Sequence, residues 1–102
     1  MGKSQYASID KRLTEMGENT KDILIYETSL CGFCHAAKKL LDKKQVEYRT
    51  IRVDLDADER QKMMERSGRR TVPQIFIEDH HVGGFDDLAL LESSGELDKL
   101  LS

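Results

Sequence analysis

Both cysteines of the chain lie three residues apart in the stretch YETSLCGFCHAAKKLL. With this spacing, Cys31 and Cys34 can act as a redox dithiol, or they can supply part of the ligand set of a structural zinc ion. With His35 directly after them, they also match Cys-x-x-Cys-His, the signal for covalent haem attachment. The rest of the sequence has to discriminate among these three kinds of chemistry.

The composition is that of one small globular domain. The chain has 102 residues, of which 38% are apolar and 34% charged, so it can form one modest core. A formal net charge of −3 gives no general attraction to nucleic acid or anionic membranes, and no apolar run approaches the roughly 20 residues of a membrane span. The N-terminus lacks the apolar segment of a secretory signal, so we expect a cytoplasmic protein. In that compartment a cysteine pair is more often catalytic or metal-binding than structural.

The hydrophobic pattern divides the chain into an N-terminal extension over residues 1–20, with weak helical spacing, and a domain over residues 21–102. The domain is predicted to begin with a buried strand over 23–26, a helix from about Gly32 to near Gln45, and a strand over 47–53. A helix follows, capped by Asp56 or Asp58 and ended by Gly68. The last elements are a strand over 73–77, a short partner strand around 81–82, and a helix followed by a second short one after Gly95.

This order of elements predicts the fold class. The first two strands are separated by a helix and must therefore be parallel, with a right-handed crossover. The last two strands are joined by a short turn and must be antiparallel. The sequence thus predicts an α/β protein in three layers, in which helices flank a small mixed four-stranded sheet.

The two cysteines are expected to have different roles. Cys31 falls where the first strand passes into the helix, so its sulfur faces unpaired amides and the positive end of the helix dipole. Both favour the thiolate, which is the attacking species. Cys34 lies one turn inside the helix on the same face, close enough to form a disulfide, and is expected to be the more buried, resolving cysteine.

The zinc and haem alternatives have weaker support. A structural zinc site needs four ligands, and beyond the cysteines the chain offers only His35, His80 and His81. Adjacent His80 and His81 lack the usual ligand spacing and would point apart. A chain without a secretory signal would not reach the compartment where haem is attached, and His35 is then a residue of the helix surface. We therefore favour the redox dithiol.

Three stretches, CGFCHAAKKLL, GRRTVPQIFI and GGFDDL, stand in the same order and spacing as in glutaredoxins. From about Asp22 to Leu101 the chain resembles this family, most closely the dithiol proteins of the short bacterial glutaredoxin-3 class. The resemblance implies the thioredoxin-like fold, glutathione as cosubstrate, and reduction of protein–glutathione mixed disulfides and other disulfides. The implied partners are glutathionylated or disulfide-containing proteins, and the implied state is a monomer.

Thr71, Val72 and Pro73 match the family's cis-proline motif. From the residues alone a trans bond is favoured, because only about 5–6% of X-Pro bonds in folded proteins are cis. The resemblance reverses this and implies a cis Val72–Pro73 bond beside Cys31, with the Val72 main chain free to pair with a cysteinyl main chain.

Gly84, Phe85, Asp86 and Asp87 can be read as an ordinary turn and helix start. The same geometry can bind the γ-glutamyl end of glutathione, as the resemblance implies. The amides of Phe85 and Asp86 would receive its carboxylate. Asp87, or less favourably Asp86, would accept its ammonium. Phe33 flanks the cysteine sulfur and is a further candidate contact.

The glycine carboxylate of glutathione needs a cation. Many relatives provide a lysine three residues before the first cysteine, where this chain has Thr28. Arg69 and Arg70, or Arg60 on the preceding helix, are the candidate replacements.

The Cys-Gly-Phe sequence raises an alternative function, because it also opens the motif of monothiol glutaredoxins. These bind a [2Fe-2S] cluster between two protomers, with glutathione sulfurs as the outside ligands. Cys31 would be the metal ligand contributed by each protomer of such a bridged homodimer.

Overall fold

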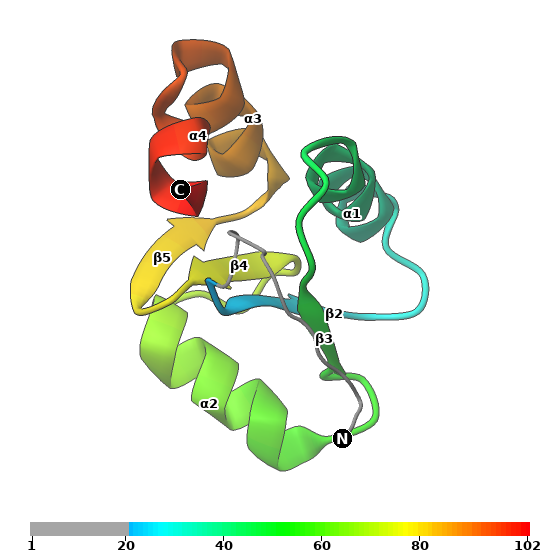
Figure 1. Ribbon diagram of the computed structural model, residues 1–102. Coiled ribbons are helices and arrows are strands. Elements are labelled where there is room, and N and C mark those ends of the chain that lie inside the picture. The colour runs from blue at the N-terminus through cyan, green and yellow to red at the C-terminus, as the bar shows by residue number, and fades with distance from the viewer. Residues whose placement is uncertain (1–20) are drawn as a thin grey trace, which may run out of the picture.

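The computed structural model describes residues 21–102 (Figure 1), and the predicted N-terminal extension lies outside the described residues. The elements in chain order are β2 (Ile23–Glu27), α1 (Gly32–Lys43), β3 (Arg49–Arg52), α2 (Ala57–Ser67), β4 (Gln74–Ile77), β5 (His80–Gly83), α3 (Phe85–Ser94) and α4 (Glu96–Leu101). No helix within this range is long and apolar enough to cross a membrane.

The four strands form one mixed sheet in the order β3-β2-β4-β5. Strand β2 pairs in parallel with β3, while the β2–β4 and β4–β5 pairs are antiparallel. The predicted mixed four-stranded sheet is confirmed. All five residues of β2 are buried, as expected for a central strand that is covered on both faces.

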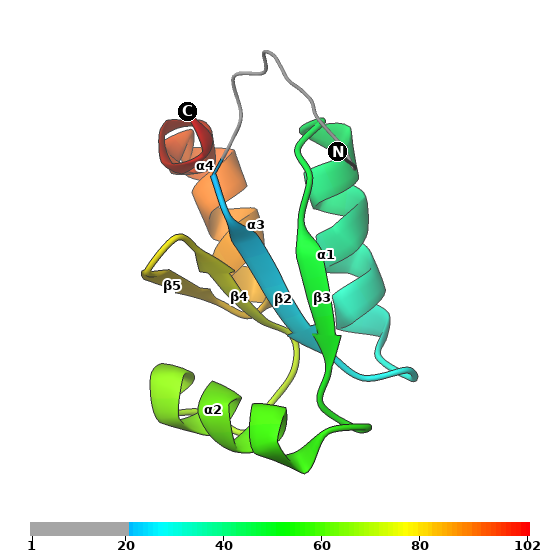
Figure 2. The same ribbon diagram turned by 60° about the horizontal axis from the view of Figure 1, so that its bottom comes forward.

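Helices cover the two faces of the sheet unequally. Figures 1 and 2 show α2 on one face and α1, α3 and α4 on the other. Because successive strand residues point to opposite faces, Ile25 and Ile75 contribute to the larger core beneath α1, α3 and α4. Leu24 and Phe76 contribute to a smaller core that packs against α2, around the fully buried Met63.

The ends of α1 and α2 have identifiable caps. Asp56 is the cap of α2 and accepts the Glu59 amide at 3.1 Å, which decides between the two predicted aspartates. Gly68 ends the same helix in the left-handed conformation, as predicted. Helix α1 ends at Lys43, slightly before the predicted Gln45, because Gln45 itself turns left-handed with φ 62°. Its amide donates to the Asp42 carbonyl at 2.9 Å, which satisfies one of the free carbonyls of the last turn.

The second predicted strand is shorter than expected, since β3 covers Arg49–Arg52 and not 47–53. Among residues 21–102 it is an edge strand whose only neighbour is β2. Its parallel register begins by aligning Leu24 with Arg49. In the part of the chain that the structure describes, residues flanking β3 outside that register have no strand partner.

Leu41 is fully buried at the centre of the larger core, so Leu41→Ala should leave a cavity there. We expect a loss of about 2–5 kcal/mol in the free energy of unfolding, measured by urea denaturation. Leu90→Ala is the matched control, because Leu90 is 68% exposed, and it should change stability by less than about 0.5 kcal/mol. Equal losses in the two variants would contradict this assignment of the core.

Candidate active site

The sulfur of Cys31 caps the N-terminus of α1. Cys31 has an extended backbone, with φ −137° and ψ 103°, and its Sγ accepts the amide hydrogen of Cys34 at 3.2 Å. This is the place where a serine or aspartate oxygen usually lies. The helix dipole directs its positive end toward the sulfur, and no acidic residue in the first turn opposes it. Cys31 is partly exposed, so its sulfur is accessible to an incoming disulfide.

Cys34 is a free thiol like Cys31, but its environment is different. Its side chain is 1% exposed. Burial, reinforced by the nearby Cys31 sulfur, raises the pKa of Cys34 to about 12. Cys34 is consequently a protonated thiol at neutral pH, as suits a group that reacts only after Cys31 has formed a mixed disulfide.

The loop before β4 closes the opposite side of the sulfur. The Cys31 thiol donates to the Val72 carbonyl oxygen at 3.7 Å, and the Val72–Pro73 peptide bond is cis. The expectation from the resemblance is therefore right, and the trans bond favoured by the residues alone is wrong.

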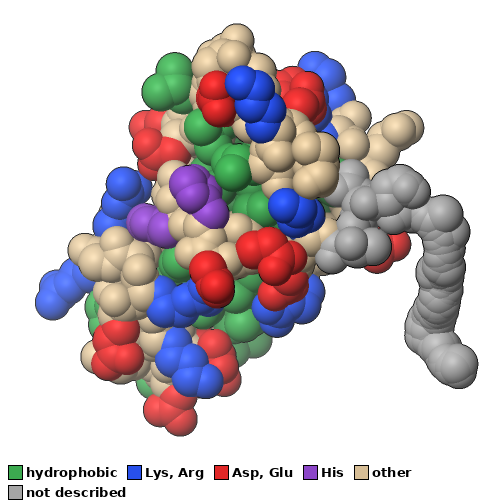
Figure 3. All heavy atoms as spheres, turned by 60° about the vertical axis from the view of Figure 1, so that its left-hand side comes forward, with side chains coloured by type: hydrophobic (Ala, Val, Ile, Leu, Met, Phe, Trp, Pro, Cys, Tyr) green, Lys and Arg blue, Asp and Glu red, His purple; other side chains and the backbone are tan. Residues whose placement is uncertain are grey.

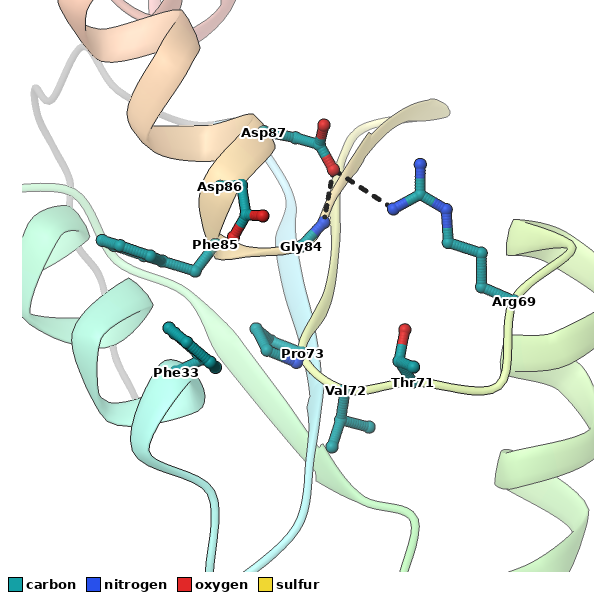
Figure 4. Close-up of a pocket in the computed structure, with 9 residues that line it drawn as sticks. All are labelled: Phe33, Arg69, Thr71, Val72, Pro73, Gly84, Phe85, Asp86 and Asp87. Carbon is teal, nitrogen blue, oxygen red and sulfur yellow. Dashed lines mark hydrogen bonds and ion pairs between the residues drawn. The ribbon is translucent and has the colours of Figure 1, made fainter.

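A pocket of about 160 Å³ lies beside this loop. Phe33 from α1, the loop before β4 and the start of α3 face one another across it (Figure 4). Its lining residues are Phe33, Arg69, Thr71, Val72, Pro73, Gly84, Phe85, Asp86 and Asp87. Val72 lines the pocket and also contacts the Cys31 sulfur, so a molecule bound in the pocket would lie next to that sulfur.

The sequence-predicted site residues are almost all brought together by this pocket. Of the candidates, Arg70 and Arg60 do not line it. Cys31 and Cys34 adjoin it through the α1 N-terminus and the Val72 carbonyl. Within residues 21–102 there is no group of three or more histidine, cysteine and acidic side chains that could hold a metal ion.

Two aromatic rings form one wall of the pocket. Phe33 and Phe85 stack with their ring centroids 6.2 Å apart and an interplanar angle of 21°. Phe33 is 63% exposed despite its size. An exposed ring at the mouth of a pocket offers apolar surface to a bound ligand or a protein substrate.

The start of α3 presents backbone amides and a carboxylate to the pocket. Gly84 is the cap residue, and its amide donates to Oδ2 of Asp87 at 3.0 Å. The same oxygen accepts Nη1 of Arg69 at 3.1 Å (Figure 4). The Gly84 amide, with Arg69 second, lowers the pKa of Asp87 below its usual range, so this carboxylate is ionised at neutral pH.

Gly83 is required by this arrangement. Its φ of 115° suits glycine, and a Cβ at this position would collide with Oδ2 of Asp87. The absence of a side chain at Gly83, the last residue of β5, therefore lets the Asp87 carboxylate approach the backbone.

Sequence reasoning missed Gln74. This polar residue comes directly after Pro73 and begins β4, whose other residues are apolar. Its side chain is fully buried. Its carboxamide Nε2 donates to the Thr71 carbonyl at 3.0 Å and to Thr71 Oγ1 at 3.2 Å. The signal that could have found it is a polar residue at the start of an otherwise apolar, buried strand, where a buried polar group has to find hydrogen-bond partners.

A protein-family model described as Glutaredoxin matches residues 23–82. The chain is 48% identical over 80 residues to Glutaredoxin 3 of Escherichia coli, an alignment that covers 78% of this chain and 96% of that protein. It is 53% identical over 81 residues to Glutaredoxin 1 of Rickettsia prowazekii, covering 78% and 85%.

Solved structures lead to the same family. A solution structure of glutaredoxin from Brucella melitensis superposes with a TM-score of 0.73 at 46% identity, over 82% of this chain and 91% of that one. A crystal structure of a buckwheat glutaredoxin–glutathione complex superposes with a TM-score of 0.73 at 31% identity, over 81% of this chain and 78% of that one.

The unequal burial of the two cysteines predicts selective alkylation. A thiol whose pKa is about 12 remains protonated as the pH rises from 7 to 9, and only the thiolate reacts. Iodoacetamide should therefore modify Cys31 and leave Cys34 unmodified across this range, as measured by peptide mass spectrometry. Protein unfolded in urea is the control and should be modified at both positions. Comparable labelling of Cys34 in the folded protein would contradict the assignment.

Proposed function

Because the chain belongs to the glutaredoxin family of thiol–disulfide oxidoreductases, we propose that glutathione is its cosubstrate and that it reduces protein–glutathione mixed disulfides and other disulfides. The observation that carries this proposal is the pocket that shares Val72 with the Cys31 sulfur. A ligand in this pocket is held next to the reacting atom.

The pocket matches the chemistry of a γ-glutamyl-cysteinyl peptide. The amides at the start of α3 suit the γ-glutamyl carboxylate. The ionised Asp87 suits its ammonium, with Asp86 as the alternative acceptor. The main chain of Val72 is positioned to pair with the cysteinyl residue. The related buckwheat protein has been solved as a complex with glutathione, which supports the same ligand here.

We propose Arg69 as the cation for the glycine carboxylate of glutathione. Arg69 lines the pocket, whereas Arg70 and Arg60 do not. The Arg69 guanidinium already donates to Asp87, so a glycine carboxylate bound there would share that guanidinium or replace the ion pair.

The mechanism on mixed disulfides needs one cysteine. The Cys31 thiolate attacks the glutathione sulfur, the S–S bond to the substrate breaks, and the substrate cysteine leaves as a thiolate that takes up a proton. A second glutathione thiolate then attacks the glutathione sulfur held on Cys31. Glutathione disulfide is released and the Cys31 thiolate is restored, where the helix N-terminus stabilises it as a leaving group.

Disulfide substrates need both cysteines. Attack by Cys31 forms a mixed disulfide with one substrate cysteine and releases the other as a thiol. Cys34 then loses its proton and attacks Cys31 Sγ, which expels the substrate and leaves a Cys31–Cys34 disulfide. Two glutathione molecules reduce this disulfide, with formation of glutathione disulfide.

The [2Fe-2S] alternative stays a prediction. The exposure of the two thiols fits ligation through Cys31 alone, because Cys34 is buried beneath it. A bound cluster would supply redox or cluster-carrier chemistry, and this chain would provide one thiolate per protomer.

We also propose that the protein works in the cytoplasm.

Cys31→Ser should abolish turnover in a glutathione-dependent assay with a glutathionylated substrate, whereas Cys34→Ser should keep much of the wild-type rate. The reason is that the mixed-disulfide cycle requires one thiolate and an external thiol. The assay also tests the proposal itself, since wild-type protein without glutathione-dependent turnover would reject it. Equal loss in both variants would reject the one-cysteine cycle.

Asp87→Asn should weaken the use of glutathione, because it removes the negative charge while keeping an oxygen that can accept the Gly84 amide. Loss of a charge-assisted bond costs about 1.5–3 kcal/mol, or roughly 10–150-fold in apparent affinity. The expected effect is near the lower limit, since this side chain is 43% exposed. Asp86→Asn is the matched control and should have the smaller effect on the apparent KM for glutathione. The reverse order would move the ammonium site to Asp86.

A further inference from the structure

Gln74 links the loop before β4 to the edge strand β5. Its Oε1 lies 2.7 Å from Nε2 of His81, and its Nε2 donates to the Thr71 carbonyl and hydroxyl. The carboxamide is fully buried, so each of these bonds forms without competition from water at the glutamine. A chain of hydrogen bonds therefore runs from the side of β5 to the loop that contains Val72.

The donor and acceptor roles along this chain are determined by chemistry. The Thr71 carbonyl can only accept, so the glutamine must turn its NH2 group toward it. Its carbonyl oxygen then faces His81, and His81 Nε2 must carry a hydrogen. With the opposite orientation of the amide, two carbonyl oxygens would face each other at hydrogen-bond distance. The Thr71 carbonyl thus sets the orientation of the Gln74 amide, and the His81 Nε2–H holds the amide in that orientation from its other end.

Packing holds the His81 ring in the required position. The ring stacks on Phe76 with centroids 4.9 Å apart and an interplanar angle of 28°. The guanidinium of Arg66 lies 3.9 Å from the centroid of the Phe76 ring. Figure 3 shows histidine side chains at the surface among basic and acidic side chains, but His81 is half-buried.

The surroundings of His81 favour its neutral form. Burial is the main cause that lowers the pKa of His81. The positive charge of Arg69 lowers it further, His80 and Arg66 add to this, and Asp87 opposes it. Both the neutral Nε2–H form and the imidazolium can donate to Gln74, so the bond persists across the titration of the ring.

We propose that Gln74 and His81 are positioning residues, which hold the 71–73 loop so that the Val72 main chain faces both the Cys31 sulfur and the glutathione pocket. This inference rests on the proposed function, because its consequence is the alignment of a cysteinyl substrate. Neither residue lines the pocket. They act through Thr71, which does.

The first test is steady-state kinetics with a glutathionylated substrate. Gln74→Met has similar length and no donor, so the Thr71 carbonyl loses its partner while the strand stays packed. We expect the apparent KM to rise roughly three- to tenfold with kcat changed less than about twofold. His81→Phe keeps an aromatic ring on Phe76 but removes the Nε2 hydrogen, and it should change KM in the same direction by a smaller factor.

His80→Phe is the matched control, because His80 is the exposed neighbour on the same strand and its side chain, unlike that of His81, makes no hydrogen bond to another described residue. Its KM should equal that of the wild type. Nitrogen-15 NMR of the imidazoles adds a readout that does not depend on activity. His81 of the wild-type protein should be in the Nε2–H tautomer, and this preference should be lost in Gln74→Met.

The outcomes separate the two proposals. An active wild type with unchanged KM in both Gln74→Met and His81→Phe would overturn the positioning role alone. A fall in kcat and thermal stability at constant KM would also overturn it, since Gln74 would then be only a structural residue. If Gln74→Met does not fold, the KM of His81→Phe decides the question. A wild type without glutathione-dependent turnover would overturn the proposed function and this inference with it.

Discussion

The Cys34 amide donates to the Cys31 sulfur, so a thiol has the place that an oxygen side chain usually has at the start of a helix. The position of the sulfur is thereby determined by where α1 can begin. That point depends on β2, which precedes α1 in the chain. Strand β2 is paired on both sides and all of its residues are buried, so the position of its C-terminal end is fixed. The Val72 carbonyl contacts the same sulfur from the other side. A shifted helix start would therefore move the Cys31 sulfur, the Cys34 sulfur and the Phe33 side of the pocket together.

The helix N-terminus contributes more to release than to attack. Unpaired amides and the positive end of the helix dipole stabilise negative charge on a sulfur at the start of a helix. A stabilised thiolate leaves faster from a mixed disulfide, although its intrinsic nucleophilicity is lower. Burial raises the pKa of the Cys34 thiol, so one turn of helix separates a partly exposed thiol from a buried, protonated one.

Much of this arrangement could be predicted from the sequence, because local signals agree with the global fold. The buried run of β2, the Asp56 cap and Gly68 each determine an element through short-range chemistry. The ends of β3 could not be predicted, since they depend on the register with β2 and not on the residues themselves. The cis Val72–Pro73 bond needed the family resemblance, as the intrinsic preference of X-Pro bonds is trans. Gln74 was missed because its partners, Thr71 and His81, are brought to it only by the loop and the β4–β5 pairing.

Two links of different strength hold the rim of the pocket on the side of α2. The Arg69–Asp87 ion pair joins side chains that are 47% and 43% exposed, and such pairs contribute only about 0–1 kcal/mol. It can open at little cost when a ligand ammonium competes for the carboxylate. The Gln74 carboxamide is buried, and breaking its bonds leaves a polar group without water. Gln74 therefore holds the 71–73 loop in place, while the exposed Arg69–Asp87 ion pair can be exchanged for other partners. The loop that contacts the Cys31 sulfur is therefore held by side chains outside α1, the helix that Cys31 caps.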